Sequence, residues 1–391
     1  MSAFELLLLE QLPGVGPATV RRLVRRFGDA GKALEAADAS FAATVGGAHA
    51  RASARARRDP TRHHRVRDAL KRAAATETAV VSWDDDLYPA ALHHLADPPP
   101  VLFLAGRLEL LRRGPTVAVV GARRSTARAR DVAGRLGTSL GRNGVTVVSG
   151  LALGVDGAAH AGALRAEGDT IAVLGAGVDV PYPRFHRRLH HQIRQRGLLV
   201  SEFPPGTNAA PHHFPRRNRL LAALSGSVVV VEAGDRSGAL ITVDHALDLG
   251  RDVWAVPGPI DTRVCVGSNR LLAEGARPFI SVDAFVAEVG GSPTGTGAAA
   301  PSEGAQLSLL TRPRGLDPSS FVSVVPTPAH DVIAEPLEHR LLRTLEEAPA
   351  QADELARRFE EPISTILAVL TTLELHGEVE RLAGMRFRRA A

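Results

Sequence analysis

Six consecutive residues, Phe214 to Arg219, combine one aromatic ring, three guanidinium groups and one amide. In order they are Phe214, Pro215, Arg216, Arg217, Asn218 and Arg219. Arginine can donate two parallel hydrogen bonds to phosphate oxygens, and a phenylalanine ring offers a flat face on which a base can stack. The stretch is therefore typical of a contact site for single-stranded nucleic acid. The alternative interpretation is a solvated basic turn that one phenylalanine anchors.

The elements that must position this stretch are short apolar runs that alternate with helical segments. The runs are Thr116–Val120, Val145–Val148, Thr170–Leu174, Leu198–Ser201, Val228–Val231 and Asp252–Val256. They are continuously apolar, as expected of parallel strands that are buried on both faces. Strands that alternate with helices predict an α/β fold, here an extended Rossmann-like, doubly wound parallel sheet. Phe214 to Arg219 would begin the helix that leads into the fifth of these strands.

The loops that follow the runs are rich in glycine and other small residues. In a doubly wound sheet the ligand binds outside the carboxyl ends of the strands, so these loops are the expected binding edge. Small residues let the backbone approach phosphates, and the helix starts that follow offer free amides. Besides the stretch above, the predicted site residues are Gly121, Arg123, Ser149, Gly150, Leu151, Ala152, Ser237, Gly238, Gly267, Ser268 and Asn269.

Composition changes along the chain predict four segments. Residues 1–72 are expected to be helical, with a helix-hairpin-helix or SAM-like turn at Leu12–Arg21. Residues 73–289 would form the Rossmann-like domain, and the glycine- and proline-rich residues 290–335 a flexible linker. Residues 336–391 read as three helices and a hairpin, which predicts a winged helix. Its third helix carries no arginine or lysine, so contact with a protein is as plausible as contact with duplex DNA.

The overall composition limits which partners, metal sites and membrane segments the chain can have. The net charge of +5 is a mild lean towards polyanionic partners. Cys265 is the single cysteine of the 391 residues, so an intrachain disulfide and a cysteine metal cage are excluded. The apolar run Leu6–Leu9 is too short to span a bilayer, and no basic residues precede it. We therefore expect a cytoplasmic protein without a membrane segment, a metal or a cofactor.

Residues 80–282 resemble the DNA-processing protein A family, also called DprA or Smf. The motifs that carry the resemblance are Val120–Arg124, Val148–Asp156, Tyr182–Pro183, Ser201–Gly206, Phe214–Arg219, Val231–Gly238, Val256–Gly258 and Gly267–Arg270. The resemblance implies a non-enzymatic protein that binds single-stranded DNA, protects incoming strands during natural transformation and helps to load the RecA recombinase. It also implies a homodimer through the Rossmann-like domain, and a DNA pocket lined by Arg123 and Phe214–Arg219.

Three enzyme classes remain as alternatives. A dinucleotide-dependent enzyme would use the same sheet, but the first loop, Gly121–Thr126, is not a G-x-G-x-x-G sequence. A nucleotide phosphoribohydrolase would carry a Gly-Gly pair that Gly234–Gly238 lacks. A nuclease would need carboxylates that converge on Mg²⁺, for which the candidates are Asp156, Glu202, Glu232 and Asp235.

Overall fold

The computed structural model describes residues 1–290, 337–359, 361, 363–375, 379–382 and 386–389. Contacts between residues divide the chain into two compact units, residues 1–298 and 299–391. The predicted linker lies, from residue 291 onward, outside the described residues.

The first unit begins with a run of helices, as the sequence predicts. They are α1 (Ala3–Glu10), α2 (Pro17–Phe27), α3 (Ala30–Glu35), α4 (Asp38–Val45), α5 (Ala50–Ala56) and α6 (Pro60–Ala75). The turn between α1 and α2 passes through Gly14, whose φ of +68° favours glycine. Leu6 to Leu9 are buried in a core that these helices share with the sheet that follows. The apolar run at the start of the chain is therefore a packing surface.

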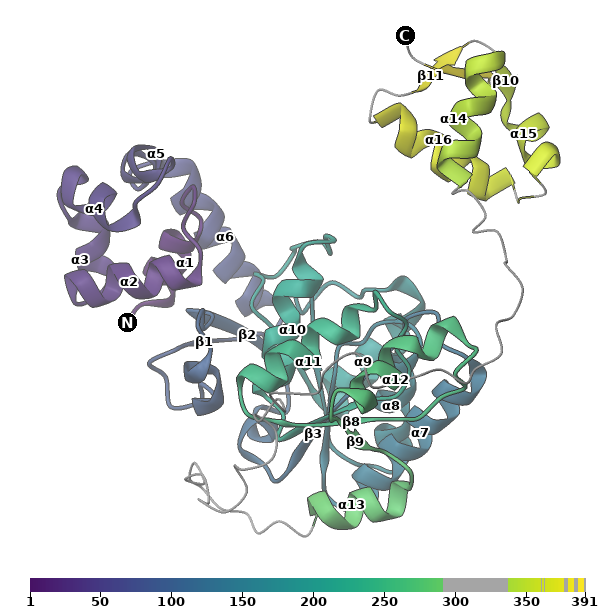
Figure 1. The fold of residues 1–391 in the computed structure, drawn as a ribbon. Helices are drawn as coiled ribbons and strands as arrows, with labels where there is room; N and C mark the ends of the chain where they lie inside the picture. The colour runs from purple at the N-terminus through teal and green to yellow at the C-terminus, as the bar shows by residue number, and fades with distance from the viewer. Residues whose placement is uncertain (291–336, 360, 362, 376–378, 383–385, 390–391) are drawn as a thin grey trace, which may run out of the picture. The chain divides into compact units, whose positions relative to one another are not determined.

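A sheet with nine strands in the described residues forms the centre of this unit (Figure 1). Its strands are β1 (Ala79–Ser82), β2 (Val101–Gly106), β3 (Thr116–Val120), β4 (Thr146–Ser149), β5 (Thr170–Val173), β6 (Leu198–Ser201), β7 (Ser227–Val230), β8 (Asp252–Ala255) and β9 (Arg277–Pro278). Their spatial order is β1-β2-β6-β5-β4-β3-β7-β8-β9. From β6 to β9 every neighbouring pair is parallel, whereas β1 and β2 extend one edge in antiparallel fashion.

Helices cover both faces of the sheet, as a doubly wound fold requires. Alternate residues of β3 point to opposite faces, so that Val117 and Val119 join one core and Ala118 and Val120 the other. The first core is closed by α7 (Ala127–Arg142), α8 (Val155–Arg165) and α13 (Val282–Gly290). Helices α9 (Arg187–Arg196), α10 (His213–Ala223), α11 (Gly238–Asp248) and α12 (Val266–Ala273) contribute buried side chains to the second.

The first unit also contains short 3-10 helices. The 3-10 helices are η1 (Ala90–His94), η2 (Leu108–Arg112), η3 (Arg184–His186) and η4 (Arg263–Cys265). All six predicted apolar runs are strands, with ends that agree within one residue. The two-residue strand β9 was not predicted, because such a short pair leaves no apolar run to detect.

The second unit contains the predicted helices and hairpin. Its helices are α14 (Leu337–Glu347), α15 (Ala352–Phe359) and α16 (Ile363–Leu375). The described strands β10 (Ala350–Gln351), β11 (Val379–Leu382) and β12 (Arg386–Arg389) pair in the order β10-β12-β11. Leu341, Ile366 and Leu370 are fully buried between these elements. The three described helices, packed on a small antiparallel sheet, form a winged helix.

In neither unit do the described ranges hold a helix with the length and apolar character needed to cross a membrane.

Candidate functional site

The loops after β3 and β7, together with α10, line an open cavity of about 770 Å³ in the first unit. Chain order reverses between β3 and β7. Strands β4, β5 and β6 lie on one side of β3, whereas β7 and β8 lie on its other side. The cavity therefore lies at the point where a doubly wound sheet binds its ligand. Predicted site residues that line it are Gly121, Arg123, Ala152, Phe214, Pro215, Arg217, Asn218, Ser237 and Gly238.

The lining of this cavity is strongly positive. Of the described residues that line it, five are arginines and one, Asp156, carries a carboxylate. The arginines are Arg123, Arg124, Arg217, Arg236 and Arg263. Arg123, Arg124, Arg236 and Arg263 are exposed, so their guanidiniums can meet a ligand from solution. Such a concentration of charge in a recess attracts anions.

Phe214 lies in the wall of the cavity with one face of its ring near a cation. The guanidinium carbon of Arg123 is 4.4 Å from the Phe214 ring centroid, and the Tyr182 ring is 5.6 Å away on centroids. Gly175 makes room for the Phe214 ring, because a Cβ atom there would lie 3.0 Å from Cδ1 of the phenylalanine. The cavity thus places an aromatic ring next to guanidinium groups, a combination that suits a base beside its phosphate.

Arg217 lies beneath the cavity and is only 3% exposed. Its Nη1 donates to the carbonyl of Gly150 at 2.8 Å and also to that of Val173. Burial lowers the pKa of Arg217 to about 10, which leaves the guanidinium charged at neutral pH. A Cβ atom at residue 150 would collide with the Arg217 guanidinium, so glycine lets this side chain lie against the loop. Arg217 therefore supplies charge from below and fixes the loop after β4.

Asp156 shapes the same loop from its other side. Its Oδ2 accepts hydrogen bonds from the backbone amides of Gly150 at 3.1 Å and Ala152 at 3.3 Å. Burial raises the pKa of Asp156, and the Arg217 charge opposes that shift. Leu151 between these amides has a φ of +56° and is buried. The loop that was predicted to approach the ligand is thus held rigid by one carboxylate.

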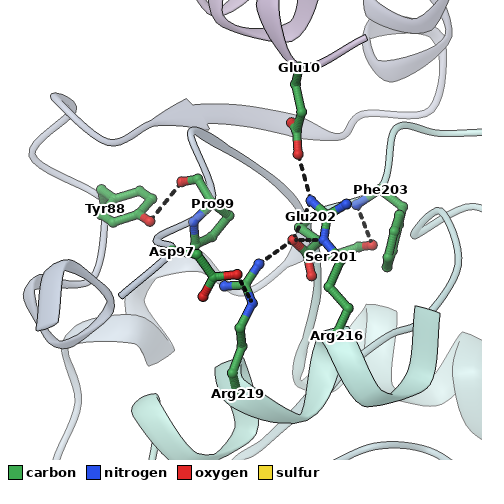
Figure 2. Close-up of polar contacts among 9 residues, drawn as sticks. All are labelled: Glu10, Tyr88, Asp97, Pro99, Ser201, Glu202, Phe203, Arg216 and Arg219. Atoms are coloured by element: carbon green, nitrogen blue, oxygen red, sulfur yellow. Dashed lines mark hydrogen bonds and ion pairs between the residues drawn. The ribbon is translucent and has the colours of Figure 1, made fainter. Parts of the chain in front are cut away.

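The arginines of the Phe214–Arg219 stretch do not share one face of α10. Arg216 and Arg219 line no part of the cavity and instead pair with Glu202, at 2.8 and 2.5 Å (Figure 2). The family resemblance implied that the whole stretch Phe214–Arg219 lines the DNA pocket, whereas Arg216 and Arg219 do not line this cavity. The physical reason for the difference is the buried Glu202 carboxylate, which requires positive partners.

The remaining predicted residues have structural contacts in place of cavity contacts. Ser149 is buried and donates to the Val119 carbonyl. Gly267, Ser268 and Asn269 are absent from the described lining of the cavity. Asn269 accepts from the Gly258 amide and donates to the Gly258 carbonyl, both at 3.0 Å. Ser268 and Asn269 therefore contact the loops after β7 and β8.

Several lining residues were not among the predicted site residues. Arg124 and Arg236 lie next to predicted positions, so charge beside a glycine-rich loop was a usable signal. Arg263 had no local signal, because only the packing of η4 against the loop after β7 brings it to the cavity. Ala209 and Ala210 also line the cavity and carry no chemistry that a sequence pattern could detect.

The carboxylates of the nuclease alternative do not converge. Glu202 pairs with arginines, and Glu232 accepts from the amide and hydroxyl of Thr126 at the start of α7. Asp235 pairs with Arg270 at 2.5 Å. Within the described part of the chain, no group of three or more His, Cys, Asp and Glu side chains is placed to hold a metal ion.

A doubly wound sheet with an arginine-lined cavity at its switch point defines a Rossmann-like protein with a site suited to an anionic ligand. Sequence comparison gives the family. The model of the DNA recombination-mediator protein A family matches residues 79–290, and that of the DprA winged helix domain matches residues 325–385. The chain belongs to the DprA family.

Individual relatives agree with this assignment. Protein Smf of Synechocystis is 35% identical over 321 residues, which cover 78% of this chain and 79% of the relative. The crystal structure of DprA from Streptococcus pneumoniae matches with a TM-score of 0.64 and 34% identity, over 74% of this chain and 98% of that one. DprA from Helicobacter pylori, whose structure was described for its single-stranded DNA binding mode, matches with a TM-score of 0.50 and 30% identity, over 55% and 96%.

Proposed function

We propose that this protein binds single-stranded DNA in the cavity between the loops after β3 and β7. The observation that carries the proposal is the placement of Phe214 and Arg123, ring against guanidinium, in the wall of a recess lined by five of the described arginines. A base stacks on the ring while the guanidiniums bind the flanking phosphates. The H. pylori relative, described for the same ligand class, supports this choice.

The shape of the site favours a single strand over a duplex. Reading a duplex commonly places a helix or ribbon in a groove, where its side chains reach base edges. Here the aromatic ring and most of the charges lie in a recess between loops and the first turns of α10 and α11. A base must leave its stack to enter the recess, which a single strand does at lower cost.

The cellular role is proposed from membership of the family. We propose that the chain acts as other DprA proteins do, on strands taken up in natural transformation, where it protects them and helps to load RecA. We further propose that it is a non-catalytic protein and forms a homodimer through the Rossmann-like unit. The family match over residues 79–290 supports these statements.

The decisive experiment compares labelled single- and double-stranded oligonucleotides of one sequence, with Mg²⁺ and without. We expect tight binding of the single strand, weak binding of the duplex and intact DNA after incubation. Equal affinity for the duplex would contradict the strand preference. Cleavage products that appear only with Mg²⁺ would instead support a nuclease.

A further inference from the structure

We propose that Glu10 and Glu202 are positioning residues for the DNA site: they hold Arg216 and Arg219 on the far side of α10, and so turn Phe214 and Arg217 towards the cavity. The inference rests on the proposed function and assigns part of it to the N-terminal helices. Figure 2 shows the arrangement, with Glu10 reaching from the end of α1 to Arg216.

Two carboxylates from distant parts of the chain hold Arg216. Its Nε donates to Glu202 at 2.8 Å, and its Nη2 donates to Glu10 at 2.5 Å. Burial lowers the pKa of Arg216, but Glu202 and Glu10 outweigh burial and the net change is upward. The Arg216 side chain is 34% exposed, and that of Glu10 is 15% exposed. The pair therefore lies at the boundary between the N-terminal helices and the sheet, within reach of water.

Arg219 completes the arrangement one helical turn further along. Its Nη2 donates to Glu202 at 2.5 Å, and its Nε lies 3.3 Å from a carboxylate oxygen of Asp97. The hydroxyl of Tyr88 donates to the Pro99 carbonyl at 2.8 Å and so fixes the loop that carries Asp97. Three carboxylates thus face two guanidiniums in this cluster. The carboxylates offset the positive charge of both guanidiniums, and the Arg219 side chain is only 4% exposed, which argues against a direct DNA contact by either arginine.

Helix geometry explains why this cluster affects the cavity. Residues three or four apart share one face of a helix, so Arg216 and Arg219 lie together. Phe214, Arg217, Asn218 and Leu221 follow the same spacing on another face, and all four line the cavity. A rotation of α10 about its axis would move both faces together. Ion pairs on one face therefore set the direction of the ring and the guanidinium on the other.

The test uses the full chain and replaces Glu10 with glutamine, which removes the charge and keeps the shape. We expect Glu10→Gln to weaken binding of a single-stranded oligonucleotide about threefold to tenfold. This effect lies between the usual cost of losing an exposed ion pair and that of losing a charged hydrogen bond. The dependence of log K on log salt should not change, because no phosphate contact is lost. Glu35→Gln on α3 is the matched control, since Glu35 is exposed and makes no ion pair with any described residue.

A second readout separates positioning from general stability. An oligonucleotide with 2-aminopurine reports base stacking through its fluorescence, and at saturating protein the signal is independent of affinity. The bound base should be less quenched in Glu10→Gln than in the wild type or in Glu35→Gln. In a cycle with Arg216→Gln, the double variant should bind no more weakly than the weaker single variant, because both act through one contact.

Each other outcome has a defined meaning. If the wild type does not bind single-stranded DNA, the proposed function fails. If it binds and Glu10→Gln behaves as the wild type, or the two substitutions are additive, the positioning role is wrong. Tighter binding by Glu10→Gln with a steeper salt dependence would also overturn it, because Arg216 would then be a phosphate ligand that Glu10 had shielded.

Discussion

At the scale of single residues, Phe214 is the side chain that offers its ring to a base. Phe214→Ala should weaken binding of a single strand by about 1–3 kcal/mol, the usual range for one stacked base. The salt dependence should stay nearly unchanged, because a neutral ring displaces no counterions. Phe185→Ala is the control, since Phe185 is 91% exposed and lies outside the lining of the cavity. A salt titration of both variants on one oligonucleotide tests this assignment, and it fails if Phe214→Ala flattens the slope.

Arg123 and Arg219 should respond differently to replacement by alanine. Arg123→Ala removes an exposed guanidinium from the cavity, so the slope of log K against log salt should flatten by about 0.7, the value for one phosphate of a single strand. Arg219→Ala breaks a buried pair with Glu202 and should destabilise the protein by about 3 kcal/mol. A salt titration of both variants detects a lost phosphate contact, and a thermal melt detects lost stability. The two measurements therefore separate a DNA contact from a structural role. A flattened slope with an unchanged melting temperature for Arg219→Ala would instead show that Arg219 contacts a phosphate.

At the scale of elements, the contact between α1, β6 and α10 centres on Glu202, whose side chain is 1% exposed. Burial raises the pKa of Glu202 to about 7, although Arg219 and Arg216 lower it, and Glu10 raises it further. The folded protein therefore binds this proton more tightly than the unfolded chain does. The contribution of this group to stability is fully present below about pH 4.5 and is lost as the pH rises through about 7.

Glu202→Gln tests this linkage, because glutamine stays neutral at every pH. The melting temperature of the wild type relative to Glu202→Gln should fall as the pH rises from about 5 to about 8. The difference between the two proteins isolates Glu202 from carboxylates such as Asp29, whose lowered pKa acts in the opposite direction. A difference that stays constant from about pH 5 to about pH 8 would contradict this expectation, because it would show that Glu202 is ionised over the whole range and that its arginine partners dominate.

At the scale of the whole molecule, the cavity lies entirely in the first unit. A fragment that ends at residue 290 should therefore keep most of the affinity of the full chain for single-stranded DNA. The measurement is a binding titration of the fragment beside the full chain, with a thermal melt to show that the fragment is folded. A folded fragment that does not bind would place part of the DNA site in the winged helix.

Much of the fold is determined by local sequence. Both faces of the central strands are buried, so Thr116–Val120 and Val228–Val231 are apolar throughout and can be recognised without a structure. The glycine-rich loops at the strand ends can be recognised too, because close approach of the backbone to another group excludes a side chain. Gly150 beneath Arg217 shows this requirement directly. The family resemblance rests on these local motifs and is confirmed over residues 79–290.

What the tertiary structure alone decided is the direction of each charged side chain. The residue type does not distinguish Arg216, Arg217 and Arg219 from one another. In a helix, however, successive side chains point in directions about 100° apart. Their roles depend on which partner lies in each direction: Glu10 is 206 residues away and Glu202 is 14 or 17 residues away. Sequence spacing carries no information about the pair with Glu10, because that pair exists only after α1 has packed against the sheet. The residue types therefore predicted a site for phosphates and bases, while packing chose which arginines face the cavity and which hold the helix in place.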